Sequence, residues 1–341
     1  MRRSRLSGKS LTCREEDTLM AIVRHTNVLL LGVLLVSIGL SAREQRGPTS
    51  TGSQAGRPTY APGTGPVIAF DEAHKNTTTF TGPYPALIEL LEADGYRPRS
   101  FAQKMSAASL ASVGVLVIVN PGGLAALAAA RAAEGRPPEE QVTAVQAASL
   151  SDDEVSAVVA WLKAGGSALL IAEHPPYVLA AAKLAAQLGI QNWPDGSTRV
   201  PEVAEIFFWR TDFYPGGEPG HAEIEGPRRR MAYQGADAVL ARHSITEGRG
   251  TNEQIQRVVT FSGSLFKLPP GGEPLLTLPT LPLDKSRPRR PDGSGWLQGA
   301  VMEVGKGRLA LFGDGGLFSG GSAADNRQFV LNVMHWLSRV L

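Results

Sequence analysis

The stretch VGVLVIVNPGG, residues 113–123, decides the fold class of this chain. Its apolar and β-branched residues run almost without interruption from Val113 to Val119, and the run ends abruptly at Asn120 and Pro121. A strand with one face in water alternates apolar and polar residues, whereas a strand buried on both faces does not. The stretch therefore predicts a central strand of a parallel sheet that is covered by helices on both faces.

Segments on both sides of this stretch alternate between strand and helix patterns. The strand patterns cover residues 67–70, 97–101 and 167–171, and the helix patterns cover residues 83–96, 151–166 and 176–188. The helix at 151–166 opens with Ser151 and Glu154, the spacing of a capping box. Such alternation predicts an α/β fold, a three-layer sandwich with a mainly parallel sheet.

The second half of the chain has a weaker pattern. Helical and strand periodicity are both lost at about residues 191–299, which predicts an irregular excursion over part of the sheet. Strand-like pieces at 257–266 and 274–278 bring the chain back to the sheet. Residues 299–318 then predict a hairpin that turns at Gly305 to Gly307. The last helix should begin near Asp325 as its N-cap, with His335 and Trp336 as packing or surface residues.

Composition and charge exclude several classes of function. The 341 residues include 34 basic and 32 acidic side chains, a net charge of only +2, so we expect no nucleic-acid partner. The single cysteine is Cys13, which precedes the apolar segment described next. This position excludes a disulfide within the mature chain, a thiolate metal cluster and a cysteine nucleophile.

The N-terminal region predicts export. Residues 27–42 are apolar and uncharged behind a basic flank, which is typical of a signal peptide or an N-terminal membrane anchor over residues 1–42, with either Met1 or Met20 as the start. Residues 43–65 have the composition of a flexible linker, so the folded domain should span residues 66–341. We expect an extracytoplasmic domain, periplasmic or secreted, or one tethered to the inner membrane by residues 27–42.

Polar side chains follow three of the predicted strands. They are Asp71, Glu72, His74 and Asn76 after the first strand, Glu173 and His174 after the SALLI strand, and Asp314 after the last. Ligands of open α/β sheets bind beyond the carboxyl ends of the strands. We therefore predict a ligand-binding site formed by these residues, with His74, His174, Glu173 and Asp314 as the candidates for catalysis.

Three chemical interpretations of these residues stay open. Imidazole and carboxylate groups could bind zinc or manganese, although no compact metal-ligand spacing supports a metal. A histidine and a carboxylate could also perform metal-free acid/base hydrolysis. The interpretation we favour is a buried hydrogen-bond network in which Asp71 and His74 satisfy loop amides. The glycine-rich GDGGLFSGG, residues 313–321, lacks the lysine of a phosphate loop, so no cofactor is predicted.

The order of motifs resembles the class I glutamine amidotransferase-like fold, and within it the DUF4350 domain. The resemblance rests on FDEAHKNTTTFTGPYPALIELLEADGY, LSDDEVSAVVAWLKAGGSALLIAE and GKGRLALFGDGGLFSGGSAADNRQFVLNVMHWL, and covers residues 66–341 with a weakly matched middle. Amidotransferases of this fold carry a cysteine at a strand-to-helix turn, where this chain has Glu173 and His174.

This resemblance implies a domain that is not a functional glutamine amidotransferase. We expect a non-catalytic domain that binds a small molecule or an envelope protein. A hydrolase built on the histidine and carboxylate cluster is the alternative. An accessory component of an envelope transport complex is a second alternative, which the resemblance alone suggests.

Overall fold

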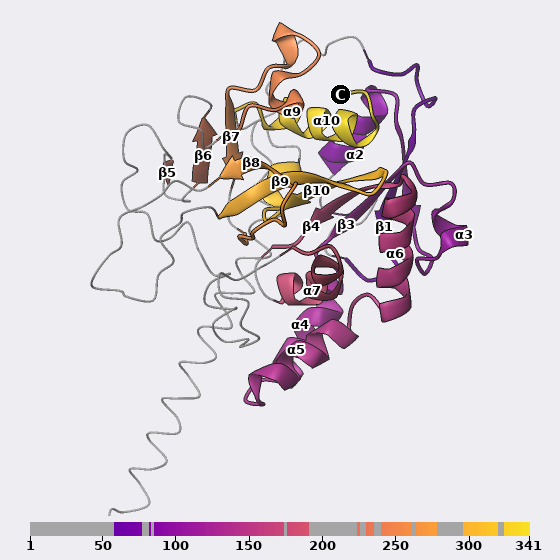
Figure 1. Cartoon of the computed structure of the whole chain (residues 1–341), viewed down its shortest axis with the longest axis vertical. Helices are drawn as coiled ribbons and strands as arrows, with labels where there is room; N and C mark the ends of the chain where they lie inside the picture. Colours follow the sequence, from indigo (N-terminus) through magenta and orange to yellow (C-terminus); the bar gives the residue numbers. More distant parts are fainter. Residues whose placement is uncertain are drawn as a thin grey trace, which may run out of the picture. The chain divides into compact units, whose positions relative to one another are not determined.

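The computed structural model describes residues 58–76, 82, 85–173, 176–190, 224–225, 230–234, 240–260, 263–277, 296–319 and 324–341. Its central feature is a seven-stranded sheet with helices on both faces (Figure 1). In spatial order the strands are β2 (Arg97–Phe101), β1 (Val67–Asp71), β3 (Val115–Val119), β4 (Ser167–Ile171), β10 (Gly307–Phe312), β9 (Leu297–Val304) and β8 (Glu273–Thr277). The pairs from β2 to β10 are parallel, and β9 and β8 are added antiparallel. The predicted α/β fold with a mainly parallel sheet is confirmed.

Strand β3 lies inside the sheet, as its sequence predicts. All five of its residues are buried, and Val117 pairs with Phe70 of β1 on one side and with Leu169 of β4 on the other. The hairpin predicted at residues 299–318 is also present, because β9 and β10 pair antiparallel on either side of Gly305. These strands lack a solvent face, which is why their sequences lack alternation.

Helices form the outer layers. On one face lie α2 (Pro85–Ala93), α9 (Ser244–Glu247) and α10 (Asn326–Leu337), and on the other face lie α3 (Ala107–Leu110), α6 (Asp152–Ala164) and α7 (Tyr177–Gln187), with α4 (Gly123–Ala132) and α5 (Pro138–Ala147) outside α7 (Figure 1). Alternate residues of each strand face opposite layers, so Phe70 packs in one core and Ala69 in the other.

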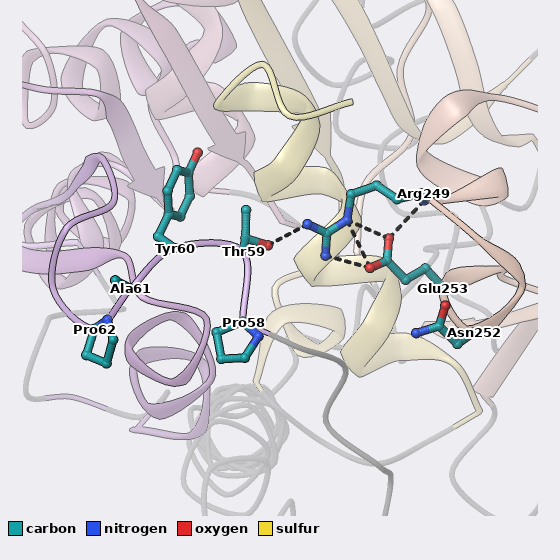
Figure 2. Close-up of a pocket in the computed structure, with 8 residues that line it drawn as sticks. All are labelled: Pro58, Thr59, Tyr60, Ala61, Pro62, Arg249, Asn252 and Glu253. Atoms are coloured by element: carbon teal, nitrogen blue, oxygen red, sulfur yellow. Dashed lines mark hydrogen bonds and ion pairs between the residues drawn. The ribbon is translucent and has the colours of Figure 1, made fainter.

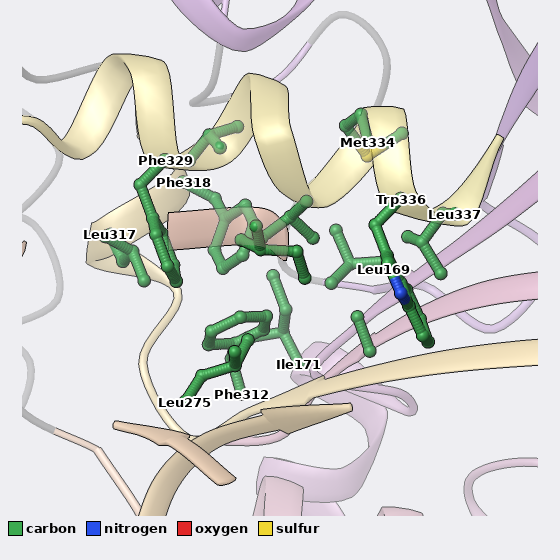
Figure 3. Packing of buried hydrophobic residues seen from close by; sticks show 14 of the residues in the cluster. Leu169, Ile171, Leu275, Phe312, Leu317, Phe318, Phe329, Met334, Trp336 and Leu337 are labelled. Carbon is green, nitrogen blue, oxygen red and sulfur yellow. The ribbon is translucent and has the colours of Figure 1, made fainter. Parts of the chain in front are cut away.

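Helix α10 packs its aromatic residues on the sheet. The rings of Phe329 and Phe312 meet edge to face with their centroids 5.9 Å apart, and Phe318 meets Phe312 at 5.0 Å (Figure 3). Edge-to-face pairs of this kind add to the stabilisation from burial. His335 and Trp336, near the end of the same helix, are both buried, so the packing interpretation of these two residues is confirmed.

The capping box of α6 forms as predicted. The Ser151 hydroxyl accepts a hydrogen bond from the Glu154 amide, and the Glu154 carboxylate accepts one from the Ser151 amide at 3.1 Å. The helix then buries Val155, Val158 and Leu162 against the sheet. This helix therefore begins where local sequence chemistry alone would place it.

Three details differ from the sequence prediction. Residues 124–149, whose alanine-rich and proline-containing sequence predicts a loose helix and loop, form the two helices α4 and α5. The strand-like piece at 257–266 contains β7 (Arg257–Thr260), which lies outside the main sheet. It belongs to a separate three-stranded sheet, in which it pairs with β6 (Arg230–Gln234) and β6 pairs with β5 (Ile224–Glu225). Asp325 stands at the N-cap of α10 but does not cap it, because its carboxylate accepts hydrogen bonds from the amides of Gln256 and Arg257 at 2.7 and 3.0 Å.

Contacts with the core begin before Pro66. Thr59 and Tyr60 each donate a backbone hydrogen bond to Asp94, and Gly65 donates one to the carbonyl of Gly95 at 2.9 Å. We call residues 58–65 the N-terminal strap. The signal-like run at 27–42 lies outside the described residues, and among the helices that are described none combines the length and the hydropathy that crossing a bilayer requires.

Candidate functional site

The carboxyl ends of β1, β3, β4 and β10 lie at one edge of the sheet, and hydrogen bonds link the loops that follow them. Gly122, after β3, donates its amide to the carbonyl of His74, after β1, at 3.0 Å. Glu173, after β4, accepts from the amide of Gly315, after β10, at 3.0 Å, and donates its own amide to the Asn120 side chain at 2.9 Å. The edge is thus a continuous network across four neighbouring strands.

His74 lies between two carboxylates in this network. Its Nδ1 is 2.9 Å from Oδ1 of Asp71, and its Nε2 is 3.0 Å from Oε1 of Glu154, the capping residue of α6. The side chains of Asp71, His74 and Glu154 are 0%, 8% and 6% exposed, respectively. An imidazole that reaches carboxylates with both nitrogens can donate to both only when it is protonated.

The two carboxylates have further partners. Asp71 accepts hydrogen bonds from the Ala73 amide at 3.2 Å and from the Asn76 side chain at 3.1 Å. Glu154 accepts from the Ser151 hydroxyl at 2.7 Å and from the Met105 amide at 3.2 Å. Buried carboxylates are tolerated when such donors surround them.

The pKa shifts of His74 and Glu154 both favour the charged forms of these side chains. Burial alone lowers the pKa of His74, but the hydrogen bonds and negative charges of Asp71 and Glu154 outweigh it, so the pKa lies above 6.5. Burial raises the pKa of Glu154, but hydrogen bonds from Ser151 and the charge of His74 outweigh that effect, so this pKa lies below 4.5. The carboxylates at both ring nitrogens therefore favour the imidazolium form of His74, in which neither nitrogen is free to accept a proton.

Glu173 belongs to a second group nearer the middle of the sheet. Besides the Gly315 amide, its carboxylate accepts a hydrogen bond from the Asn120 side chain. Asn120 adopts a left-handed backbone with φ of 51°, which turns the chain sharply after β3. Burial, together with the nearby charge of Glu173, raises the pKa of Tyr177 above 10.0. Glu173 itself is partly exposed.

The predicted site residues fall into separate places along this edge. Asp71, His74 and Asn76 form the first hydrogen-bonded group, and Glu173 anchors the second. Asp314 is buried and accepts from the Gly316 amide at 2.9 Å, and Glu72 accepts from the Ser100 hydroxyl at the rim near β2. The remaining candidate, His174, lies outside the described residues.

Sequence reasoning missed Glu154 and Asn120. The capping box accounts for one carboxylate oxygen of Glu154. No local pattern shows that the other oxygen faces a histidine 80 positions away. Asn120 could have been found, because it is the polar residue directly after a buried strand, the same signal that identified Asp71.

At the point where such folds usually bind ligands, the backbones of two loops are in close contact in this chain. The sheet order places β1 between β2 and β3, so the topological switch point lies outside the carboxyl ends of β1 and β3. There Gly123, with φ of 42°, packs so closely on the loop after β1 that a Cβ would lie 1.8 Å from the carbonyl oxygen of Lys75. The two loops leave no space between them at this contact.

A surface hollow of about 670 Å³ lies elsewhere, beside the N-terminal strap (Figure 2). Its lining residues are Pro58, Thr59, Tyr60, Ala61, Pro62, Arg249, Asn252 and Glu253. The guanidinium of Arg249 donates to both carboxylate oxygens of Glu253, at 2.6 to 3.0 Å, and to the Thr59 hydroxyl at 2.9 Å. The hollow contains none of the predicted site residues, and its one cation is paired by Glu253.

The strap also contacts a buried histidine and the carboxylate beside it. His335 of α10 lies 2.8 Å from Asp94, which accepts the Thr59 amide, and the Thr59 hydroxyl is 2.9 Å from His335. Burial raises the pKa of Asp94, but the hydrogen bonds from His335 and Thr59 outweigh it and the pKa lies below 3.8. This group fastens the strap to α10 and to the turn before β2.

Histidine, cysteine, aspartate and glutamate side chains are the usual protein ligands of metal ions. Within the described part of the chain no three of them are arranged to hold an ion. In the Asp71, His74 and Glu154 group the imidazole nitrogens point at the carboxylates rather than at a shared centre.

No protein-family model and no curated protein matches the chain. Among solved structures, it is similar to the mmIFT52 N-terminal domain, with 13% identity over 80% of this chain and 97% of that one and a TM-score of 0.48. A putative ThuA-like protein from Parabacteroides merdae shares 11% identity over 80% and 89%, with a TM-score of 0.42. A second, from Bacteroides uniformis, shares 13% over 84% and 95%, with a TM-score of 0.39. These similarities concern the α/β fold alone.

Proposed function

We propose that this chain is a non-catalytic binding domain of the amidotransferase-like superfamily, related to the DUF4350 group, that acts outside the cytoplasm. The observation that carries the proposal is the state of His74, whose two ring nitrogens are both committed to buried carboxylates. A general base needs a free nitrogen within reach of a substrate proton. The backbone contact between Gly123 and Lys75 supports the same conclusion, because it brings two loops together at the position of the usual ligand crevice.

Glutamine hydrolysis by a thiol mechanism is not part of the proposal. The turn after β4 carries Glu173 and His174, and the one cysteine of the sequence is Cys13, in the N-terminal segment. A nucleophile of this type requires an activated thiol at the site. The apolar run at residues 27–42 supports export or tethering, so the proposed partners are a small molecule or an envelope protein, including a component of an envelope transport complex.

A hydrolase centred on Glu173 is the second candidate. Glu173 is partly exposed, and the Asn120 side chain and the Gly315 amide orient its carboxylate. A positioned carboxylate at the carboxyl edge of a parallel sheet is the kind of group that acts in acid/base catalysis.

Hydrolysis assays separate the two candidates. The full chain and its Glu173→Gln variant would be incubated with chromogenic carboxylic and phosphoric esters, with and without added Zn²⁺ or Mn²⁺, and metal content would be measured by mass spectrometry. Glutamine has one acceptor oxygen where Glu173 has two, so the variant loses the hydrogen bond from Asn120 or from Gly315 and should melt at a slightly lower temperature. We expect the same background rate for both proteins. Turnover that the variant loses while it remains folded at the assay temperature would overturn the proposal in favour of the hydrolase.

A further inference from the structure

Helix α4 is unusual because it has almost no polar side. Nine of its ten residues, GLAALAAARA, are glycine, alanine or leucine, and Arg131 is the single polar one. A helix that is apolar all round is normally covered on every side. Here one side packs against α5 and α7, where Ala126 meets Val145 and Ala180 in a small core.

The opposite side of α4 is open. Leu124, Ala128, Arg131 and Ala132 are all exposed, and their spacing of four, seven and eight positions puts them in one stripe along the helix. Leu124 is 72% exposed and is the only large hydrophobic residue in that state among the described residues. Figure 1 shows α4 and α5 as the outermost helices on this face of the sheet. We define the α4 stripe as these four residues.

The α4 stripe is complementary to itself when reversed. Ala128 lies midway between Leu124 and Ala132, so two antiparallel copies that cross at Ala128 would place the large Leu124 of each over the small Ala132 of the other. Alanine at the crossing point allows the two backbones to approach closely. The aliphatic part of Arg131 can cover the flank of the same contact while its charge stays in water.

In the same antiparallel arrangement, opposite charges lie at the two ends of the α4 stripe. Exposed Lys75 lies next to the start of α4, where its carbonyl touches Gly123, and exposed Glu134 follows the end of the helix. Within the described part of the chain neither side chain has an ion pair. Reversal of one copy brings the lysine end of one helix to the glutamate end of the other, which is the self-complementarity that a two-fold interface requires.

We propose that the α4 stripe is a self-association surface that binds a second copy of this chain, with the two α4 helices antiparallel and a two-fold axis at Ala128. One short helix on each side buries less than the standard interface of about 1,600 Å², so the dimer should be weak and reversible. The proposal is independent of the proposed function, because the side chains of the α4 stripe take no part in the carboxyl-edge networks.

Cysteine crosslinking tests the two-fold axis. In the full chain carrying Cys13→Ser, solubilised in mild detergent, Ala128→Cys places a thiol at the proposed axis, and Ala160→Cys places one on the exposed side of α6 as a control. Both positions are exposed helical alanines, so neither change should affect folding. We expect Ala128→Cys to form a disulfide-linked dimer roughly tenfold faster than Ala160→Cys. Equal rates would overturn the proposal.

Introducing a negative charge into the α4 stripe tests the self-association independently of the crosslinking. Leu124→Asp should weaken the dimer roughly tenfold or more in sedimentation velocity, because burial of an unpaired carboxylate is unfavourable. Ala160→Asp should leave the self-association unchanged. A chain that stays monomeric at every concentration, or a Leu124→Asp variant that dimerises as well as the parent, would overturn the proposal whatever the hydrolysis assays show.

Discussion

At the residue scale, His74 is the side chain on which the first group of the carboxyl edge depends. Replacement by asparagine removes the cation between Asp71 and Glu154 and leaves two buried carboxylates without their shared partner. Breaking a buried ion pair from one side costs about 3–5 kcal/mol. We expect His74→Asn to lower the free energy of unfolding by an amount in that range, measured by urea denaturation.

The pH dependence of that loss has a definite sign. The pKa of His74 is higher in the folded chain than its ordinary value of 6.5, so folding binds the proton more tightly. The stabilisation is fully present below pH 6.5 and declines as pH rises through the raised pKa. The difference in unfolding free energy between the parent chain and His74→Asn should therefore shrink at alkaline pH. A difference that grows with pH would contradict the imidazolium assignment.

His243 should show the opposite pH dependence. Its Nδ1 accepts the Ile245 amide at 3.0 Å and caps α9, which requires a neutral ring. Burial lowers the pKa of His243, and the charge of Arg308 lowers it further, against the opposing charge of Glu273. Its contribution to stability is complete above pH 6.5 and is lost as pH falls toward the lowered pKa.

Asparagine at position 243 separates titration from capping. The Asn side chain can accept the same amide hydrogen but does not titrate, and Asn is a favourable N-cap residue. We expect His243→Asn to have nearly the stability of the parent above pH 6.5 and to lose less stability on acidification. If the parent chain and His243→Asn lost the same amount of stability on acidification, the protonation of His243 would not be coupled to folding.

At the element scale, Gly123 sets the position of α4 against the loop after β1. Both Gly123 and Gly135 have positive φ, 42° and 81°, but a Cβ at Gly123 would lie 1.8 Å from the Lys75 oxygen, whereas one at Gly135 would meet no atom within 4 Å. Gly135→Ala should cost only the left-handed backbone penalty of about 1–2 kcal/mol. Gly123→Ala should cost roughly 1–3 kcal/mol more, because the helix must move.

Denaturant unfolding of these two alanine variants tests the packing at the switch point. Equal losses of stability would mean that the loop after β1 can shift away from α4 without cost. In that case the contact between Gly123 and Lys75 would no longer support a non-catalytic site.

At the scale of the whole molecule, the N-terminal strap joins segments that are distant in sequence. Thr59 and Tyr60 bind Asp94, Thr59 also contacts His335 and Arg249, and the Tyr60 ring packs on Tyr96 at 5.1 Å. Each hydrogen bond contributes about 0.5–1.5 kcal/mol. We expect a chain that begins at Pro66 to melt at a clearly lower temperature than one that begins at Pro58. Equal melting temperatures would show that residues 58–65 contribute nothing to stability, as expected of the linker predicted from sequence.

Much of the architecture can be predicted from sequence because neighbouring residues determine it. The unbroken apolar run to Val119 predicts a strand buried on both faces, and Ser151 with Glu154 predicts the first turn of α6. Both inferences use residues within one element, where side-chain period and capping chemistry decide the structure. Where the structure describes them, the polar residues that follow β1, β4 and β10 lie at one edge of the sheet, because parallel strands end together.

Sequence alone determined the α/β class, the alternation of strands and helices that includes β1, β3, α6 and β4, and the absence of cysteine after Cys13. Tertiary structure alone decided what the polar residues do: it brought Glu154 to His74, and turned Asp325 from a helix cap into an acceptor for the amides at β7. The physical reason is that a hydrogen-bonding partner depends on how distant loops pack, and periodicity within one segment carries no information about that distance. Local pattern therefore predicts elements, while packing selects the contacts between them.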